Sequence, residues 1–60
     1  MAAHTTKLAY TIPEAVAASG ISRSTIYELM RDRQLPHVKI GQRTLIRRID
    51  LADLLERNLV

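Results

Sequence analysis

Basic side chains are concentrated in one stretch of the chain, between Arg23 and Arg48. Seven of the nine lysines and arginines fall in this stretch against two acidic residues, so it carries a net charge of +5, whereas the whole chain carries +3. Clustered guanidinium and ammonium groups bind polyanions by neutralising phosphates and releasing counterions. The chemistry indicated is recognition of a polyanion, and duplex DNA is the first candidate.

Other kinds of chemistry find little support in the residue types. The chain has no cysteine, and His4 and His37 have no ligand-like spacing to each other or to the carboxylates. Gly20 and Gly41 are too far apart to form a glycine-rich phosphate loop, and no serine has a histidine at a suggestive spacing. Two tyrosines are too few to form a stacking platform for single strands. We therefore expect no catalysis, metal, cofactor or small-molecule ligand.

The size and composition predict a single small domain. Sixty residues bury a limited core, and the 47% apolar share is too high for a disordered basic tail. We expect a flexible arm at residues 1–7 and one domain at residues 8–60. No apolar run approaches the roughly 20 residues of a membrane span, and the N-terminus lacks the pattern of a signal peptide. Cytoplasmic residence without membrane contact is expected.

The first helix is expected to begin after Thr11 and to end at Gly20. Thr11 and Glu14 have the spacing of a capping box, and Pro13 falls in the first turn, where its missing N–H has no partner to lose. Glycine commonly ends helices in the left-handed conformation. Residues 8–10 form a short extended segment before this helix. The inner face is expected to hold Ile12, Ala15 and Val16.

The second helix is expected to begin after Ser22, which is a good N-cap, and to stop near Arg33 because Pro36 follows closely. Apolar residues recur at helical spacing and predict the buried stripe: Ile26, Leu29 and Met30. The opposite face carries a largely polar set that includes two arginines: Arg23, Ser24, Tyr27, Glu28 and Arg31.

A β-hairpin and a third helix follow. Period-two alternation places Val38 and Ile40 on one side and Lys39 on the other, with a turn at residues 41–42 and a returning strand at residues 44–46. The apolar side is expected to pack on the helices. Asp50 is expected to cap the third helix, although a start two or three residues earlier also fits. Ile49 and Leu54 are expected to form a hydrophobic staple, and the inner stripe comprises Leu51, Leu54, Leu55 and Leu59.

Together these elements predict a mainly α fold with a small β-hairpin wing, that is, a winged helix-turn-helix with three helices. The two short helices are joined by residues 19–21, and in helix-turn-helix proteins the second helix enters the major groove.

The motifs resemble those of the excisionase-like winged-helix family, which is related to the DNA-binding domain of MerR-type regulators. The resemblance covers residues 8–58 and differs from the common pattern at Val16, where alanine is usual, and at Leu54, where an aromatic is frequent. The segments that carry it are Tyr10-Thr11-Ile12-Pro13-Glu14-Ala15, Gly20-Ile21-Ser22-Arg23-Ser24-Thr25-Ile26-Tyr27, Leu35-Pro36, Ile40-Gly41-Gln42-Arg43 and Asp50-Leu51.

This resemblance implies binding to duplex DNA by the second helix and the wing. For a protein of this length it implies a recombination directionality factor of a phage or integrative element. Such a factor acts in the cytoplasm of a bacterial host, binds adjacent sites cooperatively, bends DNA and directs an integrase toward excision. Two alternatives remain: a small transcriptional regulator that uses the same surface, and a protein-interaction module without DNA binding.

The expected DNA-binding residues are Arg23, Ser24, Thr25, Tyr27, Arg31, Lys39, Gln42 and Arg43. Arginine at the N-terminal end of the second helix suits guanine or phosphate, and a wing arginine suits a narrow minor groove. Lys39 is expected to add charge on the same outer surface as Arg43. Thr25 fits ordinary helix-start chemistry equally well. Tyr27 fits a half-core position, and Glu28 fits either cytosine or an ion pair.

Overall fold

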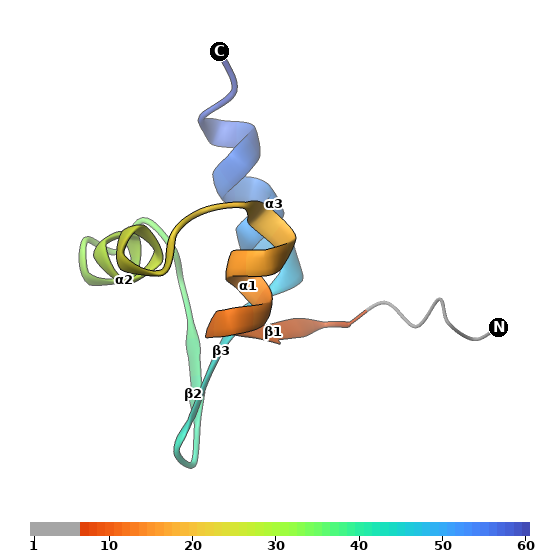
Figure 1. Ribbon diagram of the computed structural model, residues 1–60, viewed down its shortest axis with the longest axis vertical. Helices are drawn as coiled ribbons and strands as arrows, with labels where there is room; N and C mark the ends of the chain where they lie inside the picture. Colours follow the sequence, from red (N-terminus) through yellow and green to blue (C-terminus); the bar gives the residue numbers. More distant parts are fainter. Residues whose placement is uncertain (1–6) are drawn as a thin grey trace, which may run out of the picture.

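The computed structural model describes residues 7–60. The elements in chain order are β1 (Ala9–Thr11), α1 (Ile12–Ser19), α2 (Arg23–Arg31), β2 (Val38–Ile40), β3 (Arg43–Arg47) and α3 (Arg48–Arg57). The hairpin of β2 and β3 extends beyond the helices as a wing (Figure 1). None of the helices in residues 7–60 is long and apolar enough to cross a membrane. Three helices and a small antiparallel sheet confirm the predicted fold class.

Helix α1 begins and ends as its sequence predicts. The hydroxyl of Thr11 accepts from the amide of Glu14 at 3.4 Å, and the Glu14 carboxylate accepts from the amide of Thr11 at 2.9 Å. Gly20 has a φ of 78° and donates its amide to the carbonyl of Val16. The capping box and the left-handed glycine therefore fix both ends of α1.

Helix α2 ends at Arg31, two residues before the expected stop. Arg33 has a φ of 62°, which is the left-handed conformation. Its amide donates to the carbonyl of Met30 at 3.1 Å, and the amide of Gln34 donates to the carbonyl of Leu29 at 2.9 Å. These two bonds form a Schellman motif, with arginine where glycine is usual.

Seven apolar side chains form the core. Leu35, which the sequence patterns did not predict to be buried, is 0% exposed, because the turn after α2 directs it inward. Val16, Leu29 and Met30 are half-buried and pack against the core. The core residues are Ile12, Ala15, Ile26, Leu35, Ile46, Leu51 and Leu54.

The sheet has the strand order β1-β3-β2, so the extended segment at residues 9–11 becomes a third strand. Ile46 lies opposite Tyr10 and is buried against the helices. Val38 lies opposite Leu45, one residue before Ile46, and side chains alternate between faces along a strand. Val38 and Ile40 thus lie on the face away from the helices, and Ile40 is 61% exposed. The expectation that they pack on the helices was wrong.

Helix α3 begins at Arg48, two residues before the expected Asp50 cap, so the earlier start is the one observed. The Asp50 carboxylate binds the guanidinium of Arg47 with bonds of 2.6 and 3.0 Å. Asp50 lies within the first turn of α3, and its carboxylate pairs with the side chain of the N-cap residue Arg47 instead of capping the helix. Ile49 is 56% exposed, which shows that the expected staple with Leu54 was wrong.

The buried stripe of α3 is narrower than expected. Leu51 and Leu54 belong to the core, but Leu55 is 48% exposed and Leu59 is 76% exposed. The last turn of α3 therefore leaves an apolar edge in solvent.

Residues 1–6 of the expected N-terminal arm lie outside the described residues. Lys7 forms an ion pair with Glu14, and its carbonyl accepts from Nε of Arg48 at 3.2 Å. The hydrogen bonds from Lys7 and from the amide of Thr11 lower the pKa of Glu14.

Candidate nucleic-acid interface

The face of α2 that points away from the core is exposed and largely polar, with two arginines and one glutamate. Its members are separated by one, three or four positions, so they form one continuous surface. The guanidinium of Arg23 lies over the ring of Tyr27, 5.8 Å from its centroid, and a cation at this distance is attracted by the ring. This surface comprises Arg23, Ser24, Tyr27, Glu28 and Arg31, all of them exposed.

Thr25 lies apart from this surface. Its hydroxyl accepts from the hydroxyl of Ser22 at 2.9 Å. Together with Ile21 and Leu29 it lines an apolar hollow of about 240 Å³ between α2 and α3. The structure therefore places Thr25 on the flank of α2 that faces α3, beside the N-cap.

Glu28 is the acidic residue of this surface, and a second acid, Asp32, follows directly after α2. The Arg31 guanidinium lies 3.8 Å from the Asp32 carboxylate, and both side chains are largely exposed. An exposed pair of this kind contributes little stability and is easily exchanged for another partner. Glu28 forms no ion pair within residues 7–60, so of its two alternatives the ion pair is not observed there.

The wing ends in a two-residue turn that sets its tip. Gly41 has a φ of 60° and Gln42 has no positive φ, which is the pattern of a type II′ hairpin turn. Ile40 and Arg43 form the last cross-strand pair before this turn. The tip is therefore a short, defined structure rather than a long loop.

The two basic residues of the wing project from opposite faces. Lys39 lies opposite Thr44, whereas Arg43 lies opposite Ile40. Successive residues of a strand alternate between faces, so Lys39 and Arg43 cannot share one outer surface as expected. Both side chains are exposed, so the wing offers positive charge on either side.

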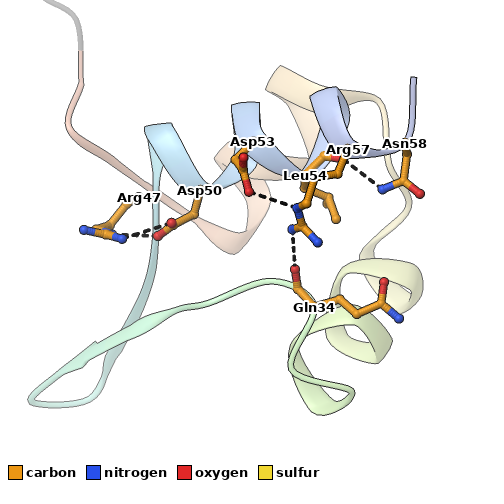
Figure 2. Close-up of polar contacts among 7 residues, drawn as sticks. All are labelled: Gln34, Arg47, Asp50, Asp53, Leu54, Arg57 and Asn58. Atoms are coloured by element: carbon orange, nitrogen blue, oxygen red, sulfur yellow. Dashed lines mark hydrogen bonds and ion pairs between the residues drawn. The ribbon is translucent and has the colours of Figure 1, made fainter. Parts of the chain in front are cut away.

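A polar connection holds the end of α2 against α3 (Figure 2). Arg57 donates to the backbone carbonyl of Gln34 at 2.8 Å and to the Asp53 carboxylate at 2.9 Å. Gln34 follows the Schellman turn of α2, so this bond helps to orient the basic helix. Sequence patterns could not identify it, because its acceptor is a main-chain oxygen 23 residues away.

Arg47 and Arg48 make contacts within the fold. Figure 2 shows the Arg47 guanidinium beside the Asp50 carboxylate, which raises the pKa of Arg47. Arg48 donates to the carbonyl of Lys7. Both residues thus help to join the sheet to α3.

The rest of the described surface offers apolar hollows rather than reactive clusters. Among residues 7–60, no group of three or more histidine, aspartate or glutamate side chains could hold a metal ion. A second hollow of about 150 Å³ lies between α1 and α3, with Tyr10, Leu51 and Leu55 in its lining.

The chain belongs to a family of helix-turn-helix domains, because the model of the family described as "Helix-turn-helix domain" matches residues 9–59. The helix-turn-helix is a DNA-binding motif whose second helix reads the major groove. Its presence indicates DNA as a partner and suggests a non-catalytic protein. Neither the curated proteins nor the solved structures contain a significant match to this chain.

Proposed function

We propose that this protein is an excisionase, a recombination directionality factor that binds and bends attachment-site DNA. The N-terminal end of α2 enters the major groove, and the wing reaches an adjacent groove. Several copies occupy neighbouring sites and position an integrase for excision. This proposal joins the helix-turn-helix family to the sequence resemblance described above.

The observation that carries the DNA-binding part is the pairing of a basic helix with a basic wing. Arg23 and Arg31 are exposed on α2, and Lys39 and Arg43 are exposed on the wing. Both elements protrude from the body of the molecule (Figure 1). Four such cations in contact with phosphates would give a slope of log K against log salt of roughly −3.6.

The architectural part follows from the small size of the domain. Bending a site costs on the order of 1–6 kcal/mol, which contacts with the bent form must offset. One domain of 60 residues offers few contacts, so cooperative binding between copies, or with integrase, is expected. A steep dependence of occupancy on protein concentration would reveal such cooperativity.

The first experiment compares binding of wild type and Arg23→Gln to a labelled attachment-region duplex and to a scrambled duplex, at several salt concentrations. We expect salt-sensitive binding, with the variant losing sequence preference and about 0.9 of the salt slope. Lys7→Gln is the charge-matched control, because Lys7 comes two residues before β1, and β1 lies on the side of the body away from α2 (Figure 1). Binding that does not depend on salt would favour a protein-interaction module instead.

The second experiment measures bending with phased sites, followed by an excision assay with an integrase and its attachment sites. Bent DNA and stimulated excision are the expected results. Straight DNA at saturating protein would refute the excisionase proposal. Specific occupancy of a promoter without bending would favour a transcriptional regulator that uses the same helix and wing.

A further inference from the structure

An exposed isoleucine stands at the tip of the basic wing. Ile40 is 61% exposed. This exposure is notable, because a domain this small needs its apolar β-branched residues for the core. It lies on the face of the sheet away from the helices, where no helix covers it. Its exposure is therefore set by the strand register, which leaves an apolar side chain beside the guanidinium-bearing Arg43.

The cross-strand partner of Ile40 is Arg43, one of the expected DNA-binding residues. Side chains directly opposite in an antiparallel pair have Cβ atoms about 4.5–5.5 Å apart. The type II′ turn at Gly41 and Gln42 holds this pair at the very end of the wing. Ile40 and Arg43 therefore approach the same part of a DNA groove together, with the longer arginine extending deeper.

We propose that Ile40 is an apolar minor-groove contact, which packs on deoxyribose and base edges beside Arg43. This inference rests on the proposed DNA binding and on the minor-groove position expected for the wing arginine, and it adds an apolar contact by Ile40. Minor-groove proteins combine an arginine, attracted by the negative potential, with apolar side chains that lie against the base steps. Lys39 lies on the other face of the wing, where it is placed to neutralise phosphates of the DNA backbone.

The test exploits the difference between apolar and charged contacts. Ile40→Thr keeps a β-branched strand former and leaves the net charge unchanged. We expect duplex binding to weaken about five- to tenfold with an unchanged salt slope. Arg43→Gln should instead lower the salt slope by about 0.9.

Ile49→Thr is the matched control, because Ile49 is also an exposed isoleucine, at 56%, but lies in the first turn of α3. It should bind as wild type does. Thermal unfolding of Ile40→Thr and Ile49→Thr should show that both remain folded, since neither side chain belongs to the core.

The groove is identified with duplexes in which only the base pairs under the wing are changed among A·T, G·C and inosine·cytosine, while the pairs read by α2 in the major groove are kept. Inosine·cytosine presents the minor-groove edge of A·T and the major-groove edge of G·C, because inosine lacks the guanine amino group. Wild type should bind A·T and inosine·cytosine duplexes alike and G·C more weakly, and Ile40→Thr should lose this preference. A preference that follows the major-groove edge would overturn the minor-groove assignment.

The inference and the proposed function fail in different ways. Salt-sensitive binding by wild type that Ile40→Thr leaves intact would overturn the role of Ile40 while DNA binding stands. If wild type binds no duplex even at low salt, the proposed function fails and takes this inference with it.

Discussion

Replacing Ile46 and Ile40 by alanine, one at a time, would measure which face of the hairpin packs on the helices. Both changes remove the same atoms from the same sheet, but Ile46 is 0% exposed and Ile40 is 61% exposed. Truncation of a buried isoleucine costs about 2–5 kcal/mol, which includes the cavity left behind. Ile40 already has most of its surface in water, so its truncation should cost less than about 1 kcal/mol.

These costs are large relative to the stability of the domain. At about 0.05–0.15 kcal/mol per residue, a chain of 60 residues has a free energy of unfolding of roughly 3–9 kcal/mol. Ile46→Ala should therefore lower the melting temperature by about 10 °C or more and leave a substantial unfolded fraction. Ile40→Ala should lower it by only a few degrees.

Urea unfolding followed by far-ultraviolet circular dichroism is the assay. A lower midpoint with an unchanged m value would assign the loss to stability rather than to a change in the unfolded state. If Ile40→Ala costs as much as Ile46→Ala or more, the register is refuted. That result would mean that the strand is shifted by one residue, which reverses every side chain.

Three further predictions concern the ends of the elements and the acid response. Arg33→Gly should raise stability by about 0.5–1 kcal/mol in the same assay, because glycine relieves a left-handed conformation that costs other residues roughly 1–2 kcal/mol; a loss of stability would contradict this. Leu35→Ala should cost about 2–5 kcal/mol because its side chain is fully buried, whereas Leu59→Ala should stay within about 0.5 kcal/mol, and equal costs would contradict the burial of Leu35. Stability should fall as the pH drops below 4.5, the ordinary pKa of glutamate, because the contacts with Lys7 and with the amide of Thr11 lower the pKa of Glu14 in the folded state. The stabilisation is present above that pH and is lost as the pH falls through the lowered pKa, so melting across this range should show a smaller decline for Glu14→Gln.

Local signals in the sequence were sufficient for the starts of α1 and α2 and for the end of α1 at Gly20. The capping box of Thr11 and Glu14, the N-cap at Ser22 and the left-handed Gly20 all involve residues within four positions of each other. Such contacts depend on residue type and spacing alone, so they can be predicted without knowledge of the fold. The concentration of positive charge on a helix and a hairpin is likewise a property of the sequence.

The tertiary structure decided which face of the hairpin is inside. Leu45 and Ile46 are adjacent in β3 and both are apolar, as is Val38 in β2. Period-two alternation therefore cannot say whether the odd-numbered or the even-numbered side chains of β3 are buried. The pairing of Tyr10 with Ile46 settles this, because β1 places both side chains against the helices. The same register separates Lys39 from Arg43 and exposes Ile40 at the tip, which are the residues of the proposed wing contact.

Contacts that exist only in the folded chain account for the other differences. Leu35 is buried because the left-handed Arg33 reverses the chain after α2, and the Asp50 carboxylate binds Arg47 within the first turn of α3 instead of capping the helix. The bond from Arg57 to the carbonyl of Gln34 joins segments that are distant in the chain. By itself the sequence determined both ends of α1, the start of α2 and the sign of the surface charge. The direction in which each side chain points depended on packing between distant segments, because only the assembled sheet and helices fix the register.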